Sequence, residues 1–401
     1  MNIKLILRYL TNNVLLQLLG IIFSGASVKM LTLSELGLFN LAKSLAGSFQ
    51  YTHLGLRYSL DRFLPEGNTD SNTKILHITI IVNSIISFLL FIFYCFLYKF
   101  NFFLLCYILG GWLFATFSLI RVYNRGIGQL NYFVYLTFIS NMLVIVIPFT
   151  GLYFKGEKGL FLGYMCITFF LLIKYFPKEL FNIKFVFNKI DFIKFFNTGI
   201  PLFISNFATF FGENIDKFMI NHFLGLRAVG EFSIITLVYS LILMFPSLVV
   251  ELIFTEYIKQ KESKNILKNI ILKHIIISSI LILFSILLSY FVLPSVLDYF
   301  FPKYYYLIPQ IKIIVLAIIP YIFISPSYCL LFAHDESIKI SIVNVISLLL
   351  YFIAIYFLLL NSYTVEYILY SKIIYVIFYS IGLLFLLWKC GLINKYYLND
   401  K

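Results

Sequence analysis

The sequence predicts an all-α polytopic membrane protein, with about twelve transmembrane helices in two parallel-repeat six-helix bundles around a central cleft. Composition is the first of three observations behind this fold class. Hydrophobic residues make up 61% of the 401-residue chain and charged residues 12%, against roughly 45–50% and about 25% in an average soluble domain. A water-soluble fold could not bury this much apolar surface, so the expected solvent is the lipid bilayer.

Long apolar windows are the second observation, since a spanning helix needs roughly 20 predominantly apolar residues. The windows that qualify cover residues 10–31, 36–58, 75–98, 101–120, 132–154, 159–176, 198–224, 230–255, 270–293, 308–332, 338–360 and 365–388. The first window has no small-residue cleavage site after it. We therefore expect it to remain as the first span rather than to be removed as a signal peptide.

An internal repeat is the third observation. Residues 31–41 read LTLSELGLFNL and residues 224–234 read LGLRAVGEFSI. Gly37 matches Gly230 at an offset of 193 positions (230 − 37), and a phenylalanine follows two positions later in both copies. An offset near half the chain indicates a duplicated unit. Each half contains six windows, an even number, so both halves begin on the same side of the membrane and the repeats are parallel.

The basic residues between the windows predict the orientation of the chain. Most of them fall in the gaps on the side that also holds both ends of the chain. Positively charged gaps tend to stay in the cytoplasm, so we expect both termini there. The opposite side carries only Lys29, Lys99, Lys155, Lys158, Arg227 and Lys303.

The expected organisation has three parts: an N-terminal six-helix lobe at 1–181, an interfacial amphipathic linker at 182–197, and a C-terminal six-helix lobe at 198–401. The linker begins NIKFVFNKIDFIKFF, with polar residues at about helical spacing and Ile and Phe between them. Such a segment is expected to lie flat at the cytoplasmic interface. It serves either as a stiff connection between the lobes or as a lipid-recognition element.

Charged residues inside the apolar windows are the candidate site. Each costs roughly 2.5–3.5 kcal/mol at the centre of a span on insertion scales, so each is a functional candidate. Glu213, Asp216 and Lys217 lie in the window 198–224, at spacings that place them on one helical face. If Glu213 and Lys217 neutralise each other, Asp216 is left over, and a surplus carboxylate suits proton or Na⁺ coupling. The alternative is a structural ion pair that fixes helix packing.

A second group of candidates is basic. Lys29 lies near the outer end of the first window, Lys43 about two turns into the second, and His53 and Arg57 toward the inner end of the second. Lys29 and Arg57 are near enough to the membrane interfaces to snorkel, whereas Lys43 is harder to explain in that way. If these side chains face the cleft, they form a ladder of positive charge that suits an anionic, phosphate-bearing substrate.

Enzyme signatures are absent from the sequence. The five histidines form no HExxH or paired metal pattern, and no Gly-rich nucleotide loop ends in Lys-Ser or Lys-Thr. We therefore expect no enzymatic activity, no metal site, no cofactor and no ATP-driven transport by this chain. Nucleic acid is not an expected partner, because the basic residues form no continuous stripe. Internal duplication in a polytopic membrane protein is instead typical of transporters.

Several short stretches resemble a known family, and the most specific of them lie along the window 198–224. They are LGLF at 36–39, LGLR at 54–57, RFLPE at 62–66, GIP at 199–201, DKFMI at 216–220, FLG at 223–225 and VGEFS at 229–233. With them, nearly the whole chain resembles the polysaccharide-biosynthesis flippases (Wzx type). These belong to the multidrug/oligosaccharidyl-lipid/polysaccharide exporter superfamily.

The resemblance implies a substrate made of an oligosaccharide repeat unit on undecaprenyl pyrophosphate. Such flippases work in the bacterial cytoplasmic (inner) membrane. They move the unit from the cytoplasmic to the periplasmic leaflet for O-antigen, lipopolysaccharide, capsule or exopolysaccharide biosynthesis. The resemblance also implies alternating access driven by an H⁺ or Na⁺ gradient, with a polysaccharide polymerase and a chain-length regulator as partners.

The same resemblance assigns roles to charges that match by position. Substrate binding falls to Lys29, Lys43, Arg57 and Lys217, and ion coupling or charge pairing to Asp216. Glu213 joins Asp216 in that second role from helix geometry alone.

Other functions stay open at this point. A multidrug or cation exporter of the same superfamily would favour acidic cavity residues, and a lipid II flippase commonly has additional C-terminal spans. An O-antigen polymerase or ligase, an enzyme of the same pathway, carries a large periplasmic loop, whereas the outer gaps predicted here are short. A non-transporting scaffold predicts that neutralising Lys43 and Lys217 has no phenotype.

Overall fold

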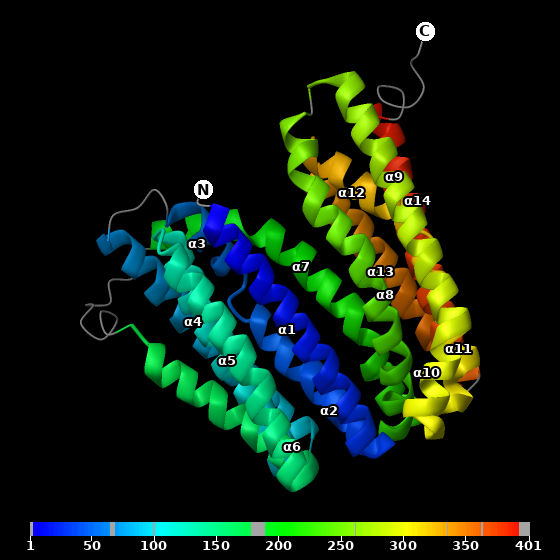
Figure 1. Ribbon diagram of the computed structural model, residues 1–401. Coiled ribbons are helices and arrows are strands. Elements are labelled where there is room, and N and C mark those ends of the chain that lie inside the picture. Colours follow the sequence, from blue (N-terminus) through cyan, green and yellow to red (C-terminus); the bar gives the residue numbers. More distant parts are fainter. Residues whose placement is uncertain are drawn as a thin grey trace. The chain divides into compact units, whose positions relative to one another are not determined.

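The computed structural model describes residues 3–64, 69–98, 101–177, 189–260, 262–334, 336–361 and 364–392. These described residues are almost entirely helical, and none of them forms a strand (Figure 1). The chain divides into two compact units, Met1–Phe207 (unit 1) and Ala208–Lys401 (unit 2). The predicted all-α fold in two helical bundles is confirmed.

The described part of unit 1 contains five long helices, one short helix, one 3₁₀ turn and the first part of α7. They are α1 (Ile3–Met30), α2 (Leu33–Ser48), the 3₁₀ turn η1 (Phe49–Tyr51), α3 (Leu56–Phe63), α4 (Thr69–Leu97), α5 (Phe102–Gly126), α6 (Leu130–Tyr175) and α7 (Lys189–Leu224). α6 is a hairpin rather than one straight helix, because Lys155 and Gly156 have non-helical backbone angles. Its two arms therefore supply two of the expected spans.

Unit 2 contains the second part of α7 and the remaining elements. These are α8 (Leu226–Lys259), α9 (Lys264–Leu287), the π turn η3 (Leu288–Val292), α10 (Leu293–Phe300), η4 (Pro302–Leu307), α11 (Ile308–Val315), η5 (Leu316–Ile318), α12 (Tyr321–Ala333), α13 (Ser337–Asn361) and α14 (Val365–Lys389).

Nine stretches of the described chain are long and apolar enough to cross a membrane. One of them is α6, which counts twice because it is a hairpin. The 16-residue α2 and the charged α7 are not among the nine, although both fall in expected spans. With these additions the described residues provide the twelve passes that the apolar windows predict. α2 carries Lys43 of the predicted site, and α7 carries Glu213, Asp216 and Lys217.

The repeat in the sequence corresponds to a repeat in the order of helices. α2 begins at Leu33 directly after α1, and α8 begins at Leu226 directly after α7, again 193 positions apart (226 − 33). The matched Phe39 and Phe232 are both buried. α5 and α11 begin 206 positions apart (308 − 102), because unit 2 contains α10 and η4 before α11. The constant offset between the two copies therefore ends at this insertion.

The second expected span, 36–58, is not one continuous helix. The chain leaves the helix after η1, and Leu54 and Gly55 adopt positive φ angles of 48° and 91° before α3 begins. The backbone of Gly55 touches that of Gly199 in α7, and a Cβ on either glycine would overlap the other residue's carbonyl group. Two stretches of the family resemblance, LGLR and GIP, therefore meet at one backbone contact inside unit 1.

The predicted division of the chain at 182–197 remains a prediction. Residues 178–188 lie outside the described residues, and Lys189–Asn197 form the first turns of α7. Phe195, in these turns, is buried in a cluster of unit 1 that includes Leu60 and Leu64. Contacts divide the chain between Phe207 and Ala208, inside α7.

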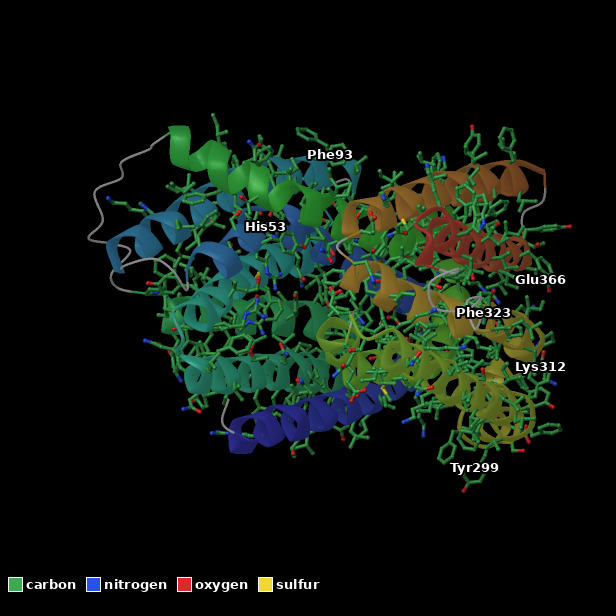
Figure 2. All side chains as sticks on the ribbon, turned by 90° about the horizontal axis from the view of Figure 1, so that it is seen from above. His53, Phe93, Tyr299, Lys312, Phe323 and Glu366 are labelled. Carbon is green, nitrogen blue, oxygen red and sulfur yellow. The ribbon has the colours of Figure 1, made fainter. Side chains whose placement is uncertain are left out.

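Large apolar side chains are exposed along α4, α9, α13 and α14. Examples are Ile85, Phe88, Leu89 and Phe93 of α4; Ile276, Ile280, Leu283 and Phe284 of α9; Ile342, Ile346, Leu349 and Ile353 of α13; and Ile377, Ile381, Phe385 and Trp388 of α14. Figure 2 shows Phe93 and Tyr299 pointing away from the helices. Surfaces of this kind are stable against hydrocarbon and unstable against water, so these four helices have lipid-facing sides.

Candidate functional site

α2 and the η1 turn that follows it expose one narrow polar stripe. Its members (the α2 stripe) are Asn40, Lys43, Gly47 and Gln50. Spacings of three, four and three residues place them in one line along the helix. Residues between them, such as Leu41 and Leu45, are buried in unit 1. The exposed side of this helix is therefore polar, in contrast to the exposed sides of α4 and α9.

Lys43 lies at the depth of the bilayer interior. It is ten residues into α2 (43 − 33), or about 15 Å from the start of the helix, which is half of a hydrocarbon core of about 30 Å. A lysine that faced lipid at this depth would cost roughly 2.5–3.5 kcal/mol. The α2 stripe is consequently a surface for water or for a polar ligand.

The Lys43 side chain packs against an aromatic ring. Its Nζ lies 5.6 Å from the ring centroid of Phe39, a cation–π distance. Phe39 in turn packs edge-on against Phe23 and Tyr107, each at 5.9 Å between ring centroids. Lys43 as a residue is exposed, and no acidic side chain among the described residues pairs with it. Its charge is available to an anion.

In unit 2, α7 also exposes polar residues at bilayer depth. Thr209 and Glu213 are exposed, and Lys217 is half-buried. Spacings of four residues place the three in one line (the α7 stripe). Glu213 lies eleven residues before the end of α7 at Leu224 (224 − 213), or about 16 Å. The α7 stripe therefore also requires water or a polar ligand.

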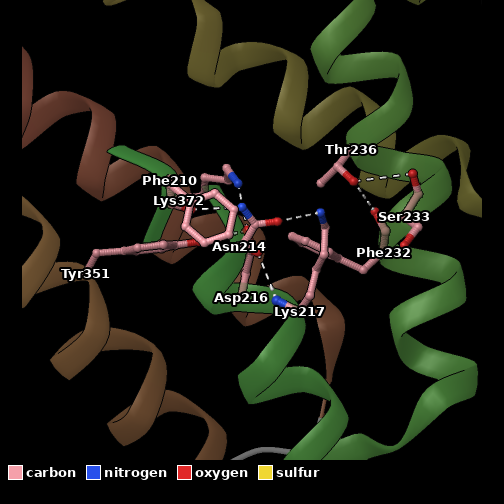
Figure 3. Close-up of polar contacts among 9 residues, drawn as sticks. All are labelled: Phe210, Asn214, Asp216, Lys217, Phe232, Ser233, Thr236, Tyr351 and Lys372. Carbon is pink, nitrogen blue, oxygen red and sulfur yellow. Dashed lines mark hydrogen bonds and ion pairs between the residues drawn. The ribbon is translucent and has the colours of Figure 1, made fainter. Parts of the chain in front are cut away.

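A buried ion pair lies beside the α7 stripe (Figure 3). The Nζ of Lys372, on α14, lies 2.6 Å from Oδ2 of Asp216. Asp216 has no exposed surface and Lys372 is 8% exposed. The ammonium also lies 5.8 Å and 5.9 Å from the ring centroids of Phe232 and Tyr239 on α8. The pair thus links α7 to α14, and its ammonium packs against two aromatic rings of α8.

The second oxygen of Asp216 has a partner as well. Its Oδ1 accepts a hydrogen bond of 2.9 Å from the backbone N–H of Lys217. The hydroxyl of Tyr351, on α13, donates to Oδ2 over a long 3.4 Å. The side chain of Lys217 donates to Oδ1 of Asn214 at 3.1 Å. Both charged ends of the Asp216–Lys372 pair are enclosed by unit 2, as buried charges must be.

Comparison with known proteins decides the fold. No family model and no curated protein matches the chain. Solved structures do, among them an inward-facing multidrug resistance MATE family transporter, with a TM-score of 0.67 and 14% identity over 95% of this chain and 96% of that chain. The lipid II flippase MurJ, in an inward closed conformation, gives 0.72 and 15% over 94% and 87%. This is the fold of the transporters of the multidrug/oligosaccharidyl-lipid/polysaccharide exporter (MOP) superfamily.

The MOP fold leaves the cargo open. A third similar structure is a MOP superfamily transporter from Pyrococcus furiosus, with a TM-score of 0.61 and 15% identity over 98% of this chain and 96% of that chain. Its description reports a reversed polarity of the binding pocket that suggests a different function. Proteins that share the MOP fold thus differ in their pockets, and the side chains of this chain must indicate its substrate.

Within this MOP fold, the predicted basic ladder does not form a single cluster. Lys29 is exposed in the last turn of α1, Lys43 lies in the middle of α2, and Arg57 is half-buried in the first turn of α3. These are three different levels along the spans. His53 is buried at the break, where its Nδ1 accepts a hydrogen bond of 3.0 Å from the backbone N–H of Gly55. Its place in the structure is explained by the turn that it stabilises.

The three candidate residues of α7, Glu213, Asp216 and Lys217, differ from expectation in their surroundings. Asp216 is not left over by a Glu213–Lys217 pair, because its partner is Lys372. Residues three apart on a helix differ by about 60° in direction. Helices α13 and α14 supply Tyr351 and Lys372 on the side of Asp216, whereas Glu213 stays exposed.

Lys372 was not among the expected site residues, although the sequence contains a signal for it. Lys372 lies inside the expected span 365–388, so the cost of an intramembrane charge already points to it. Its partner is 156 residues away in the sequence. No local spacing rule reaches across that separation, so only the packing of α14 against α7 reveals the pair.

Proposed function

We propose that the protein is a flippase for anionic, lipid-linked oligosaccharides. It moves undecaprenyl-pyrophosphate-linked repeat units from the cytoplasmic to the periplasmic leaflet of the bacterial inner membrane, for O-antigen, capsule or exopolysaccharide synthesis. It does so by alternating access, and both of its termini lie in the cytoplasm. The fold of the MOP-superfamily transporters, a fold shared with a lipid II flippase, supports this class of activity.

The observation that carries the proposal is the α2 stripe. A lysine halfway across the membrane, exposed and next to Asn40, Gly47 and Gln50 along one line, has no use against lipid. Its Nζ is held over Phe39 but carries no ion pair within the described residues. A mobile anion is the ligand that satisfies this geometry, and a pyrophosphate presents several oxygens to one ammonium.

Physical chemistry favours a lipid-linked anion over a soluble one. A pyrophosphate that carries several sugars cannot cross hydrocarbon unaided, because its charges and hydroxyls would be buried without partners. The α2 stripe offers amide, ammonium and backbone groups to such a head group. The apolar exposed sides of α4 and α9 suit the polyprenyl tail, which can remain in the bilayer.

The remaining predicted residues take supporting roles. Lys29 and Arg57 extend the positive charge above and below Lys43, and Lys217 binds substrate from the α7 stripe. Glu213 and Asp216 serve ion coupling or charge pairing, with H⁺ or Na⁺ as the coupling ion. A polysaccharide polymerase and a chain-length regulator are the partners that would receive the flipped unit.

A second candidate function is export of cations or drugs. Glu213 favours it, because this carboxylate is exposed at bilayer depth without an ion pair among the described residues. A cationic cargo would bind at Glu213 and would have no need of Lys43. Substituting the two residues one at a time distinguishes the two functions. A flippase for anions needs Lys43, whereas an exporter of cations needs Glu213.

The test measures the leaflet location of lipid-linked units in cells that lack this gene. We expect single undecaprenyl-linked units to accumulate on the cytoplasmic side and the wild-type gene to restore polymer. Lys43→Gln should lower polymer at least tenfold, and Lys43→Arg should retain most of it, because a planar cation still binds phosphate. Units that accumulate unpolymerised in the periplasm would indicate a polymerase instead.

Lys158→Gln is the matched control. Lys158 is exposed, and its Nζ lies 5.4 Å from the ring centroid of Phe103. It therefore makes the same kind of cation–π contact as Lys43. It lies beside the kink of α6, between the expected spans 132–154 and 159–176. We expect polymer to stay at the wild-type level. Normal polymer with Lys43→Gln would contradict the proposal, and lost drug resistance with Glu213→Gln would favour the exporter.

A further inference from the structure

The structure contains a buried carboxylate whose cation is covalently attached to the chain. We propose that Lys372 is the built-in cation of unit 2. Its ammonium takes the place that a free metal cation would need at Asp216, so that Na⁺ does not bind this carboxylate while the pair is intact. The inference deepens the proposed function, on which its meaning for ion coupling rests, because it removes Na⁺ as the ion that acts at Asp216.

The first step is the completeness of the site around the ammonium. The Lys372 Nζ contacts the Asp216 carboxylate at 2.6 Å, and the rings of Phe232 and Tyr239 lie within 6 Å of it. An ammonium prefers this combination of one carboxylate and aromatic faces. Na⁺ instead needs several oxygen ligands. Two aromatic faces and a single buried carboxylate fit an ammonium better.

The second step is a comparison between the two copies of the repeat. Phe39 and Phe232 occupy the same repeat position, and in each unit a lysine Nζ lies over that ring, at 5.6 Å for Lys43 and 5.8 Å for Lys372. The repeat position of Asp216 is held in unit 1 by Phe23 (216 − 193), whose ring packs on Phe39. Unit 1 therefore has an exposed lysine over this ring and no carboxylate at the repeat position of Asp216.

The divergence of the two copies follows a simple charge rule. Where the carboxylate is present, the lysine over the phenylalanine is buried and paired; where phenylalanine replaces the carboxylate, the lysine is exposed. The two lysines come from different helices, α2 and α14. In unit 2, Asp216 thus neutralises the charge of Lys372. In unit 1, the charge of Lys43 remains for a ligand.

The third step is competition. A tethered ammonium acts at a high effective concentration, because its helix holds it next to the carboxylate. A Na⁺ ion that displaced it would also leave a buried ammonium without its partner, which is strongly unfavourable. Na⁺ therefore competes poorly with Lys372 at ordinary salt concentrations.

Thermal unfolding of the purified full-length protein in detergent tests the inference without any transport. We expect the wild type to have the same Tm in NaCl and in choline chloride at equal ionic strength. Lys372→Met should lower Tm in choline chloride, because Asp216 is left buried without a counter-charge. NaCl should then recover part of the loss, since Na⁺ binds the freed carboxylate and stabilises the folded state.

Three variants complete the experiment. Asp216→Asn should lower Tm with no response to Na⁺, and the double variant Asp216→Asn with Lys372→Met should recover part of the loss, again with no response. Lys339→Met is the matched control, because Lys339 pairs with Glu336 at 2.8 Å but is 48% exposed. We expect it to change Tm little, as exposed pairs contribute little.

Two results would overturn the inference: a Na⁺-specific rise in Tm for the wild type, or a folded Lys372→Met variant that does not respond to Na⁺. If Lys372→Met does not fold, the wild-type titration and the double variant decide. An unresponsive wild type with a folded double variant supports the built-in cation. A protein that fails as a flippase can still pass this test, so the two proposals fail separately.

Discussion

Gly55 and Gly199 form a close backbone contact in unit 1 that leaves no room for a side chain. Their backbones touch where α7 crosses the break before α3, and Gly55 has a φ of 91°. A side chain at Gly199 would have to push two backbones apart. This contact explains in physical terms why glycine is found at both positions of the LGLR and GIP stretches.

Gly199→Ala should destabilise the protein by about 1–3 kcal/mol, the usual cost of overpacking a close contact. Thermal unfolding in detergent measures the change. Gly20→Ala is the control, because Gly20 lies inside α1 and a Cβ there meets no atom within 4 Å. It should be neutral or should stabilise by roughly 0.5–1 kcal/mol, since alanine favours a helix interior. Equal effects of the two variants would contradict the contact.

Lys43 and Lys372 show that residue type and membrane depth do not settle a role. Both lie in spans and both cover a phenylalanine ring. One is exposed, whereas the other is buried against Asp216. The carboxylate supplied by a distant helix makes the difference, so the first lysine is proposed as a ligand group and the second as an internal counter-ion.

At the scale of helices, the exposed side of each element separates water from lipid. α2 exposes Lys43 and Gln50, whereas α4 exposes Ile85 and Leu89. Both helices are exposed along one side, which is polar in α2 and apolar in α4. In the break that follows α2, by contrast, the polar groups are buried and paired with one another: the Thr52 hydroxyl donates to the Phe49 carbonyl at 2.7 Å and lies 2.7 Å from Ser87 Oγ.

Single cysteines on these two helices test the assignment of their exposed sides. In a cysteine-free background, Gly47→Cys and Gln50→Cys should react with a membrane-impermeant, charged thiol reagent, because the α2 stripe meets water. Leu89→Cys, which replaces a side chain 57% exposed on α4, should stay unlabelled because it meets lipid. Labelling measured by mass shift in membranes decides the point. Efficient reaction at position 89 together with protection at 47 would reverse the assignment.

At the scale of the whole molecule, the duplication predicts topology. α2 and α8 begin at equivalent positions of the repeat, each directly after a long helix. Six passes in each half return the chain to its starting side. The two short connections before α2 and α8 should therefore lie on the same side of the membrane, opposite to both termini.

Reporter insertions at Thr32 and Gly225 should both give periplasmic signals, and an insertion at Gln260, directly after α8, should give a cytoplasmic one. Alkaline phosphatase activity and fluorescence measure the two sides. The insertion at Gln260 is the control for the insertions before α2 and α8. Opposite signals at Thr32 and Gly225 would contradict parallel repeats.

Much of the fold could be predicted because hydrophobicity is a local property. The windows 75–98 and 338–360 correspond closely to α4 and α13, since each apolar run must satisfy its own backbone as a helix in lipid. The break in the window 36–58 was not predicted. It depends on Gly55 meeting Gly199, which belongs to α7.

The sequence by itself determined the solvent, the number of passes, the duplication and the presence of costly charges such as Lys43 and Asp216 within spans. These properties follow from composition, window length and repeat register, each of which is read along the chain. Only the tertiary structure decided which charges are exposed and which are paired. The partner of Asp216 is Lys372, 156 residues away, and the packing of helices, not sequence distance, brings such groups together.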